Sequence, residues 1–109
     1  MPAFRKLPKA DLDNLVRQIV DLTSPVSIFL FGSATDDDLL PKNDIDVLIV
    51  LPDGSPVRRQ AHLLNRKVER NGYSIDFVVV SEQEFATQRE NHWSVVHTAV
   101  QQGERLYAA

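Results

Sequence analysis

Apolar residues recur along this chain first with helical spacing and then with strand-like spacing. Between Lys9 and Leu22 they return every three or four positions, which indicates an amphipathic helix. Val26–Phe31 is a short apolar run rich in branched and aromatic residues, which favours a strand. Gly32-Ser33 ends that strand, and the polar, acidic stretch Ala34–Lys42 predicts one helical turn that stops before Pro41.

Downstream, strand-like and helical segments are separated by proline, glycine and asparagine. The expected elements are a central strand at Asp44–Leu51, a helix at Val57–Arg70 closed by Asn71-Gly72, a strand at Tyr73–Val80, a helix opened by the capping box Ser81–Glu84, a helix at His92–Gln102 ended by Gly103, and a short edge strand at Glu104–Tyr107. Strands that are joined through helices predict an α+β fold, a small mixed sheet with helices packed against it.

Two of the predicted strands carry carboxylates where strands usually carry apolar side chains. Asp44 and Asp46 are two residues apart, so both point to one face of their strand, while Ile45 and its apolar neighbours face the core. Asp76 lies in the next strand, on the side away from the core positions. If the two strands are neighbours, the three carboxylates share one face of the sheet.

Grouped carboxylates are costly unless something neutralises them. Two like charges about 4 Å apart cost about 4 kcal/mol at an effective dielectric constant near 20, and a whole domain is stable by only about 5–15 kcal/mol. Hard carboxylate oxygens suit Mg²⁺ or Mn²⁺, and an Asp-x-Asp pair can bridge two such ions. Alternatively, Asp44 caps a turn and Asp46 is simply a solvated strand residue. Aspartate is depleted in strands, so the combination with Asp76 favours the metal interpretation.

The Gly32-Ser33 pair is a candidate phosphate-binding turn because of what it follows. A glycine directly after a buried strand lets the backbone approach a phosphate closely, and a serine hydroxyl with nearby N–H groups can bind phosphate oxygens. The same dipeptide also fits an ordinary strand-to-loop turn, so it gains meaning only beside the carboxylates.

Length and charge limit the possible functions. The chain has 109 residues, enough for one domain over 1–109 and no second one. A net charge of −3 disfavours DNA or RNA as a routine partner. The sequence has no cysteine, no signal-peptide pattern and no apolar run long enough to cross a membrane, which fits a cytoplasmic protein.

The motifs in combination resemble a known family. Gly32-Ser33, a gap of ten residues, Asp44-Ile45-Asp46 and then Asp76 on a following strand are similar to the signature of the DNA polymerase beta-like nucleotidyltransferase superfamily. Within it, the chain looks like the minimal nucleotidyltransferases, and His97–Tyr107 resembles that family's closing segment. The resemblance implies the polymerase beta-like fold.

The resemblance also implies an activity and a partner. Asp44, Asp46 and Asp76 would be the catalytic and metal-binding residues, with Asp76 activating the attacking hydroxyl, and Gly32 and Ser33 would hold the triphosphate. It implies Mg²⁺, two ions or Mn²⁺ in its place, and ATP as the substrate. Many such domains are antitoxins paired with a helical HEPN ribonuclease toxin, so the acceptor of AMP is expected to be a tyrosine of that toxin.

Two alternatives remain at this stage. The domain could be a binding module that neutralises a partner by contact alone, which is favoured by Asp36–Asp38 close to the expected triphosphate and by the absence of a basic residue directly after Gly32-Ser33. Lys42, Arg58 or Arg59 could supply that positive charge. Alternatively, the acceptor could be a small molecule, although such enzymes usually have a further domain for it.

Overall fold

A mixed sheet of four strands runs through the middle of the protein. The computed structural model describes residues 8–31 and 44–109, with Asp44 described through its backbone only. The strands are β1 (Ser27–Phe31), β2 (Asp44–Leu51), β3 (Ser74–Ser81) and β4 (Glu104–Ala108), in the order β3-β2-β1-β4. β2 pairs with β3 in parallel, whereas β1 is antiparallel to both β2 and β4. The expected α+β fold with a small mixed sheet is therefore confirmed.

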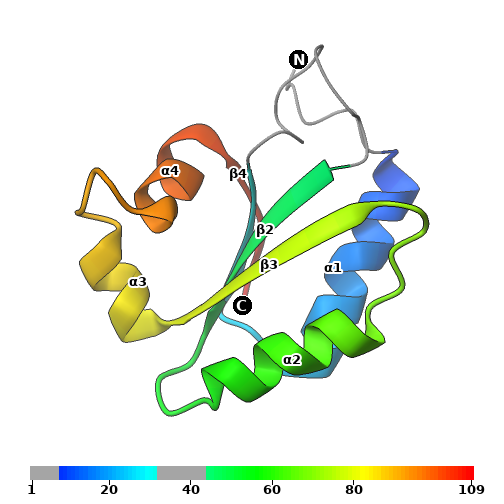
Figure 1. The fold of residues 1–109 in the computed structure, drawn as a ribbon, viewed down its shortest axis with the longest axis horizontal. Coiled ribbons are helices and arrows are strands. Elements are labelled where there is room, and N and C mark those ends of the chain that lie inside the picture. The colour runs from blue at the N-terminus through cyan, green and yellow to red at the C-terminus, as the bar shows by residue number, and fades with distance from the viewer. Residues whose placement is uncertain (1–7, 32–43) are drawn as a thin grey trace.

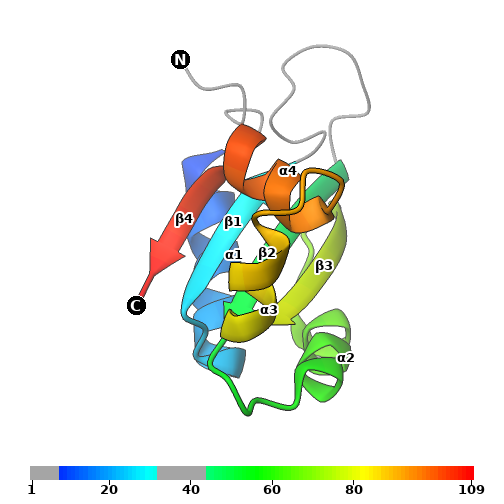
Figure 2. The ribbon, with the colours of Figure 1, turned by 90° about the vertical axis from the view of Figure 1, so that its left-hand side faces the viewer.

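Two pairs of helices cover the two faces of this sheet. α1 (Lys9–Thr23) and α2 (Val57–Lys67) lie on one side, and α3 (Glu82–Gln88) and α4 (Val95–Gln102) lie on the other (Figures 1 and 2). Within residues 8–31 and 44–109, none of these helices has the length and apolar content needed to span a lipid bilayer.

The alternation of side chains along the strands divides the interior into two apolar clusters. One lies under α1 and α2, and its buried members from β1, β2 and β3 are Ile28, Leu30, Ile45, Val47, Ile49, Leu51 and Ile75. The other lies under α3 and α4 and contains Phe29, Phe31, Leu48, Val50 and Val80 from the same strands. β1 and most of β2 are therefore buried on both faces, which explains why their sequences are almost wholly apolar.

The helix α2 ends three residues earlier than its apolar pattern predicts. It stops at Lys67, and Val68 is extended yet remains buried against the first cluster. Asn71 and Gly72 do not cap the helix. Both have positive φ, and the N–H of Tyr73 donates to the carbonyl of Arg70 at 2.8 Å. The prediction of a helix to Arg70 is wrong because Val68 reaches the core from extended backbone, and Asn71-Gly72 forms a tight turn into β3.

The last helix begins three residues later than predicted, at Val95 instead of His92. Ser94 is its N-cap, with a hydroxyl that accepts from the N–H of His97 at 3.0 Å. Residues 89–94 form a turn that joins α3 to α4. A capping box has two reciprocal hydrogen bonds, and one of the two predicted at the start of α3 is confirmed. The Ser81 hydroxyl accepts from the N–H of Glu84 at 3.1 Å. The helical turn expected at Ala34–Lys42 lies outside the described residues.

Gly103 permits the close crossing of α4 and β4 over β1. A Cβ atom at this position would lie 2.4 Å from the carbonyl oxygen of Leu30, 2.6 Å from that of Ala99 and 2.8 Å from the Cβ of Phe31. No side chain fits there without a movement of backbone. The glycine thus allows β4 to pair with β1 directly after α4 ends.

Candidate active site

Asp46 and Asp76 lie side by side on neighbouring strands. The two residues are direct partners in the parallel pairing of β2 with β3, and Asp44 precedes them opposite Ser74. Partners in parallel strands point to the same face, and neighbouring strands are about 4.8 Å apart. The face that they share is the one covered further along by α3 and α4, since Leu48 and Val80 follow with the same parity and belong to that cluster. The expected adjacency of the two strands is confirmed.

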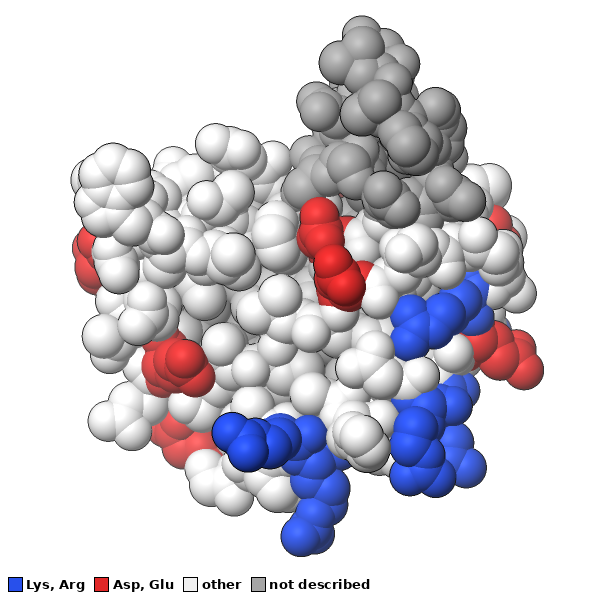
Figure 3. Space-filling model, viewed as in Figure 1, with Lys and Arg blue, Asp and Glu red and all other residues white. Residues whose placement is uncertain are grey.

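The covering helices stop just before the carboxylates. On β2, Leu48 is fully buried, whereas Asp46 is half-buried. On β3, Val80 is buried, Val78 is half-buried, and Asp76 is exposed. Exposure therefore rises steadily towards the beginning of both strands. Figure 3 shows acidic side chains at the surface near the middle of the view, with a basic group to their right and further basic side chains towards the lower edge.

The strand β1 ends next to Asp46 of β2. Phe31, the last residue of β1, is the antiparallel partner of Asp46 and provides a buried apolar neighbour on the same face. Phe31 also directly precedes the Gly32-Ser33 pair in the sequence. Gly32 and Ser33, together with Asp36–Asp38 and Lys42, lie outside the described residues, so their predicted contacts stay predictions.

The start of β3 is held in place by polar contacts on the opposite side of the sheet. The Tyr73 hydroxyl donates to the Asp11 carboxylate at 3.0 Å, and burial together with this partner raises the pKa of Tyr73 above its usual value. Gln18 of α1 makes two hydrogen bonds with the backbone of Glu69, at 2.7 and 3.3 Å. These contacts connect α1 to the turn that leads into β3 and so fix the position of Asp76.

Arg70 contributes to the same support. Its guanidinium donates to the carbonyl of Ile75 at 2.9 Å and to Asn65 at 3.0 and 3.1 Å, and it lies 5.5 Å from the centre of the Phe77 ring. The bond to Ile75 occupies a carbonyl next to Asp76 in the sequence. Arg70 is thus a structural residue, fixing the edge of the sheet that carries the carboxylate.

The donor set matches a hard divalent cation in its chemistry. Asp46 and Asp76 offer carboxylate oxygens on one open face, and Mg²⁺ is usually bound by one or two carboxylates with the remaining positions left to water and substrate phosphates. Among the side chains that the structure describes, no group of three metal-binding residues is formed. The third expected ligand, Asp44, has its backbone on the same strand face, while its side chain is not part of the description.

Comparison with known proteins identifies the family of this chain and a solved structure that shares its fold. The profile of the nucleotidyltransferase domain family matches residues 12–104. The chain therefore belongs to the nucleotidyltransferase domain family. No curated protein matches the sequence at a significant level.

One solved structure shares the fold. It is described as a candidate nucleotidyltransferase from Sulfolobus solfataricus, with a TM-score of 0.59 and 18% sequence identity. The match covers 91% of this chain and 78% of the other. At this identity the likeness supports the fold alone, and it agrees with the predicted nucleotidyltransferase fold.

Two candidate sources of positive charge for a triphosphate are placed elsewhere. Arg58 and Arg59 belong to α2, which packs on β3 from the side of α1, whereas Asp46 and Asp76 face the side of α3 and α4. The expectation that either arginine lies next to the carboxylates is not supported by this arrangement. Within the described residues, the carboxylate face gains no cation from α2.

The sequence pattern did not decide whether Trp93 is buried or exposed. Trp93, which could belong to the core or to an interface, is 94% exposed in the turn between α3 and α4, so a core role is excluded. The backbone around it is well fixed: Trp93 N–H donates to Asn91 at 3.0 Å and the Ser94 hydroxyl donates to the carbonyl of Gln88 at 2.7 Å. Trp93 lies within the predicted helix His92–Gln102, but the helix begins at Val95, so the residue stands in the preceding turn.

Proposed function

We propose that this domain transfers AMP from ATP to an acceptor hydroxyl, with magnesium held by Asp44, Asp46 and Asp76. The observation that carries the proposal is the direct pairing of Asp46 with Asp76 on an open face of parallel strands. Membership of the nucleotidyltransferase domain family supports the same chemistry. Gly32 and Ser33 are proposed to bind the triphosphate through backbone N–H groups and the serine hydroxyl.

In this proposal each carboxylate has a separate role. Divalent ions bound at the site would supply charge neutralisation of the triphosphate and of the leaving group. Asp44 and Asp46 would hold those ions and so the nucleotide. Asp76, the more exposed of the described pair, accepts the proton of the acceptor hydroxyl. The acceptor oxygen then bonds to the α-phosphorus, the bond between the α- and β-phosphates breaks, and pyrophosphate leaves.

The acceptor is proposed to be a protein, a tyrosine of a cognate helical HEPN ribonuclease toxin that this domain silences as an antitoxin. The support is the resemblance to minimal nucleotidyltransferases, together with the exposure of Asp76. An exposed base can be reached by a side chain on the surface of another protein. A small-molecule acceptor is the weaker alternative, because enzymes with such acceptors usually have a further domain for them.

The test is mass spectrometry of an intact HEPN-type helical protein, chosen as partner where a neighbouring gene encodes one, after incubation with ATP and Mg²⁺. The wild type is expected to add one or more adenylyl groups to a partner tyrosine. Asp76→Asn is nearly isosteric, so it should fold normally but lose transfer by about 10²–10⁴-fold, the usual contribution of general-base catalysis. If both proteins neutralise the partner equally and neither modifies it, the domain is a binding module and the enzymatic proposal is wrong.

A further inference from the structure

The helix α2 carries positive charge only, and its basic residues have no partners among the described residues. Its sequence from Val57 to Lys67 contains three arginines, one lysine and one histidine but no acid, in a chain whose net charge is −3. Arg70, directly beyond it, makes several hydrogen bonds. By contrast, Arg58, Arg59 and Arg66 make no ion pair or hydrogen bond within residues 8–31 and 44–109.

The basic residues in the first turn of α2 do not stabilise the helix itself. Two arginines stand in the first turn of α2, where the positive end of the helix dipole disfavours cations. The N-cap position is Pro56, which has no side chain able to accept a hydrogen bond from the first turn. The dipole favours Arg66 and Lys67, which stand in the last turn of the helix. Local structure therefore gives no reason for Arg58 and Arg59, whereas a negatively charged partner does.

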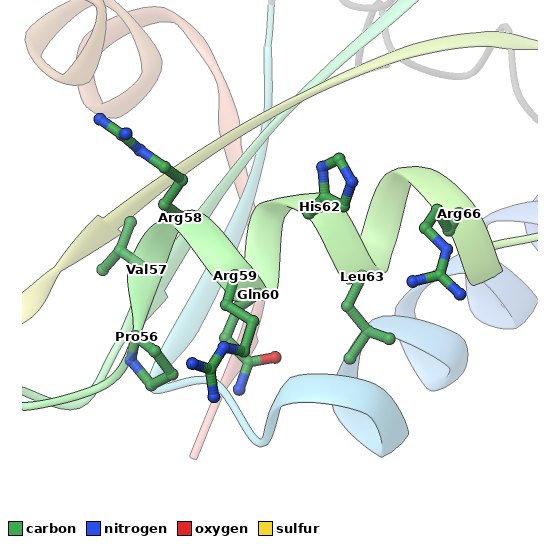
Figure 4. A pocket seen from close by; sticks show the side chains of 8 residues that line it. All are labelled: Pro56, Val57, Arg58, Arg59, Gln60, His62, Leu63 and Arg66. Atoms are coloured by element: carbon green, nitrogen blue, oxygen red, sulfur yellow. The ribbon is translucent and has the colours of Figure 1, made fainter.

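The surface of α2 is hollowed along its length. An open depression of about 890 Å³ is lined by Pro56, Val57, Leu63 and the basic residues of the helix. Figure 4 shows Arg59, Leu63 and Arg66 projecting from the same side of α2, with Arg58 and His62 on the other. The first three residues are spaced four and three positions apart, so they form a row in which a half-buried leucine separates two arginines.

We propose that this row is a docking surface for an acidic amphipathic helix of a partner protein. A helix with carboxylates flanking an apolar side chain at the same spacing would match Arg59, Leu63 and Arg66 in order. Single-stranded nucleic acid is a poorer fit, because its bases stack best on large aromatic rings and α2 has no Phe, Tyr or Trp. The overall negative charge also opposes a polyanion as long as a nucleic acid.

The surface is separate from the carboxylates. α2 covers the face of the sheet that Asp46 and Asp76 do not occupy, so a bound helix leaves both acids accessible. Docking of a helix on α2 is therefore independent of nucleotidyl transfer at the carboxylates.

The experiment uses the whole protein and a synthetic helical peptide of about 20 residues, long enough to be helical alone, with glutamates on both sides of a leucine face. Fluorescence anisotropy is expected to show binding that weakens as ionic strength rises and that is lost when the glutamates are replaced by glutamine. Amide chemical shifts should change along α2 and not along α4.

The double variant Arg59→Glu with Arg66→Glu should weaken binding by about ten-fold or more, and Leu63→Gln by about three-fold, as expected for truncation of interface anchors. Arg17→Glu with Arg105→Glu is the control, since it changes the net charge equally at exposed sites on α1 and β4. It should alter binding by less than about two-fold. Unchanged thermal unfolding would show that each variant is folded.

Three results would overturn the proposal. The first is an absence of peptide binding at low salt, and the second is an equal loss of binding in the control variant. The third is tighter binding of oligouridylate than of the peptide with the same dependence on Arg59 and Arg66, which would make α2 a nucleic-acid surface. None of these results would bear on the proposed nucleotidyl transfer, which is tested separately by measuring nucleotide binding.

Discussion

Asp46 and Asp76 face each other across the parallel strands β2 and β3, at the point where the cover of α3 and α4 ends. Like charges directly opposite each other in a sheet are destabilising by several tenths of a kcal/mol to about 1 kcal/mol. The fold tolerates this pair because the site is open to water on its exposed side. The same openness lets a divalent cation and a phosphate approach.

The first prediction concerns the stability of the protein without metal. In a chelator, Asp76→Asn should raise the free energy of unfolding by about 0.5–1 kcal/mol, because it removes the repulsion with Asp46. That corresponds to an increase of about 2–8 °C in Tm for a domain of this size. Thermal unfolding at low ionic strength measures it, with the exposed Glu90→Gln as the control.

In Mg²⁺ the wild type should become more stable than Asp76→Asn. Binding to the folded state alone raises the Tm of the wild type, while Asp76→Asn should gain much less and Glu90→Gln should gain as much as the wild type. Equal stabilisation of all three proteins by Mg²⁺ would show that Asp76 does not contribute to a metal site.

The second prediction concerns Gly103. Gly103→Ala would place a Cβ within 2.4–2.8 Å of Leu30, Ala99 and Phe31, and overpacking of this kind costs about 1–3 kcal/mol. Gly54→Ala is the matched control. It has a positive φ but no atom within 4 Å of the added Cβ, so it should cost about 1 kcal/mol through backbone strain alone. Urea unfolding measures both, and an equal or smaller loss at Gly103 would contradict the described crossing of α4 and β4.

The alternation of side chains along each strand could be predicted from the sequence, whereas the ends of the helices could not. Period-two spacing places Asp44 and Asp46 on one side of β2, and Asp76 on the side of β3 away from its core positions, because a side chain in a strand has only two faces to choose from. That the three share one face was conditional on β2 and β3 being neighbours, which the structure shows. The actual pairing partner, Asp76 opposite Asp46, depends on register, which the turn at Asn71-Gly72 and the contacts of Tyr73 determine.

The errors have a common physical origin. Val68 continues the apolar stripe of α2, but it is buried from extended backbone after the helix has ended. His92 and Trp93 were assigned to the last helix, although Ser94 provides the N-cap and leaves Trp93 exposed. In both cases apolar spacing reports which residues can be buried, whereas the helix boundary is set by caps and turns that spacing does not detect.

The third prediction follows from the bond between Tyr73 and Asp11. The pKa of Tyr73 is raised above 10.0 in the folded protein, by burial first and then by the Asp11 carboxylate. A raised pKa means that the stabilisation is complete below the unfolded value and is lost as pH rises through the folded value. At pH 8, Tyr73→Phe should lower the free energy of unfolding by about 1 kcal/mol, the usual net value of such a bond.

Above pH 10 the difference between wild type and Tyr73→Phe should shrink, because the wild-type tyrosine becomes an anion next to Asp11. Tyr107 is present in both proteins, so its ionisation cancels in the comparison. Chemical unfolding at several pH values gives the two curves. Parallel curves across this range would indicate that the hydrogen bond between Tyr73 and Asp11 does not contribute to the stability of the protein.

The last prediction separates nucleotide binding from turnover. If Asp44 and Asp46 hold the nucleotide through metal, Asp44→Ala with Asp46→Ala should weaken ATP binding in Mg²⁺ by about ten-fold or more, a loss of about 1.4 kcal/mol per factor of ten. Asp76→Asn should retain much of the ATP binding although it weakens one metal, since Asp44 and Asp46 are proposed to hold the nucleotide and Asp76 to take the proton. Titration calorimetry with and without Mg²⁺ measures both. Asp21→Ala with Glu90→Ala removes the same negative charge at exposed positions and is the control. ATP binding that is equal in the wild type and in the Asp44/Asp46 variant would mean that the carboxylates are not the ligands, even if the fold and the family assignment stand.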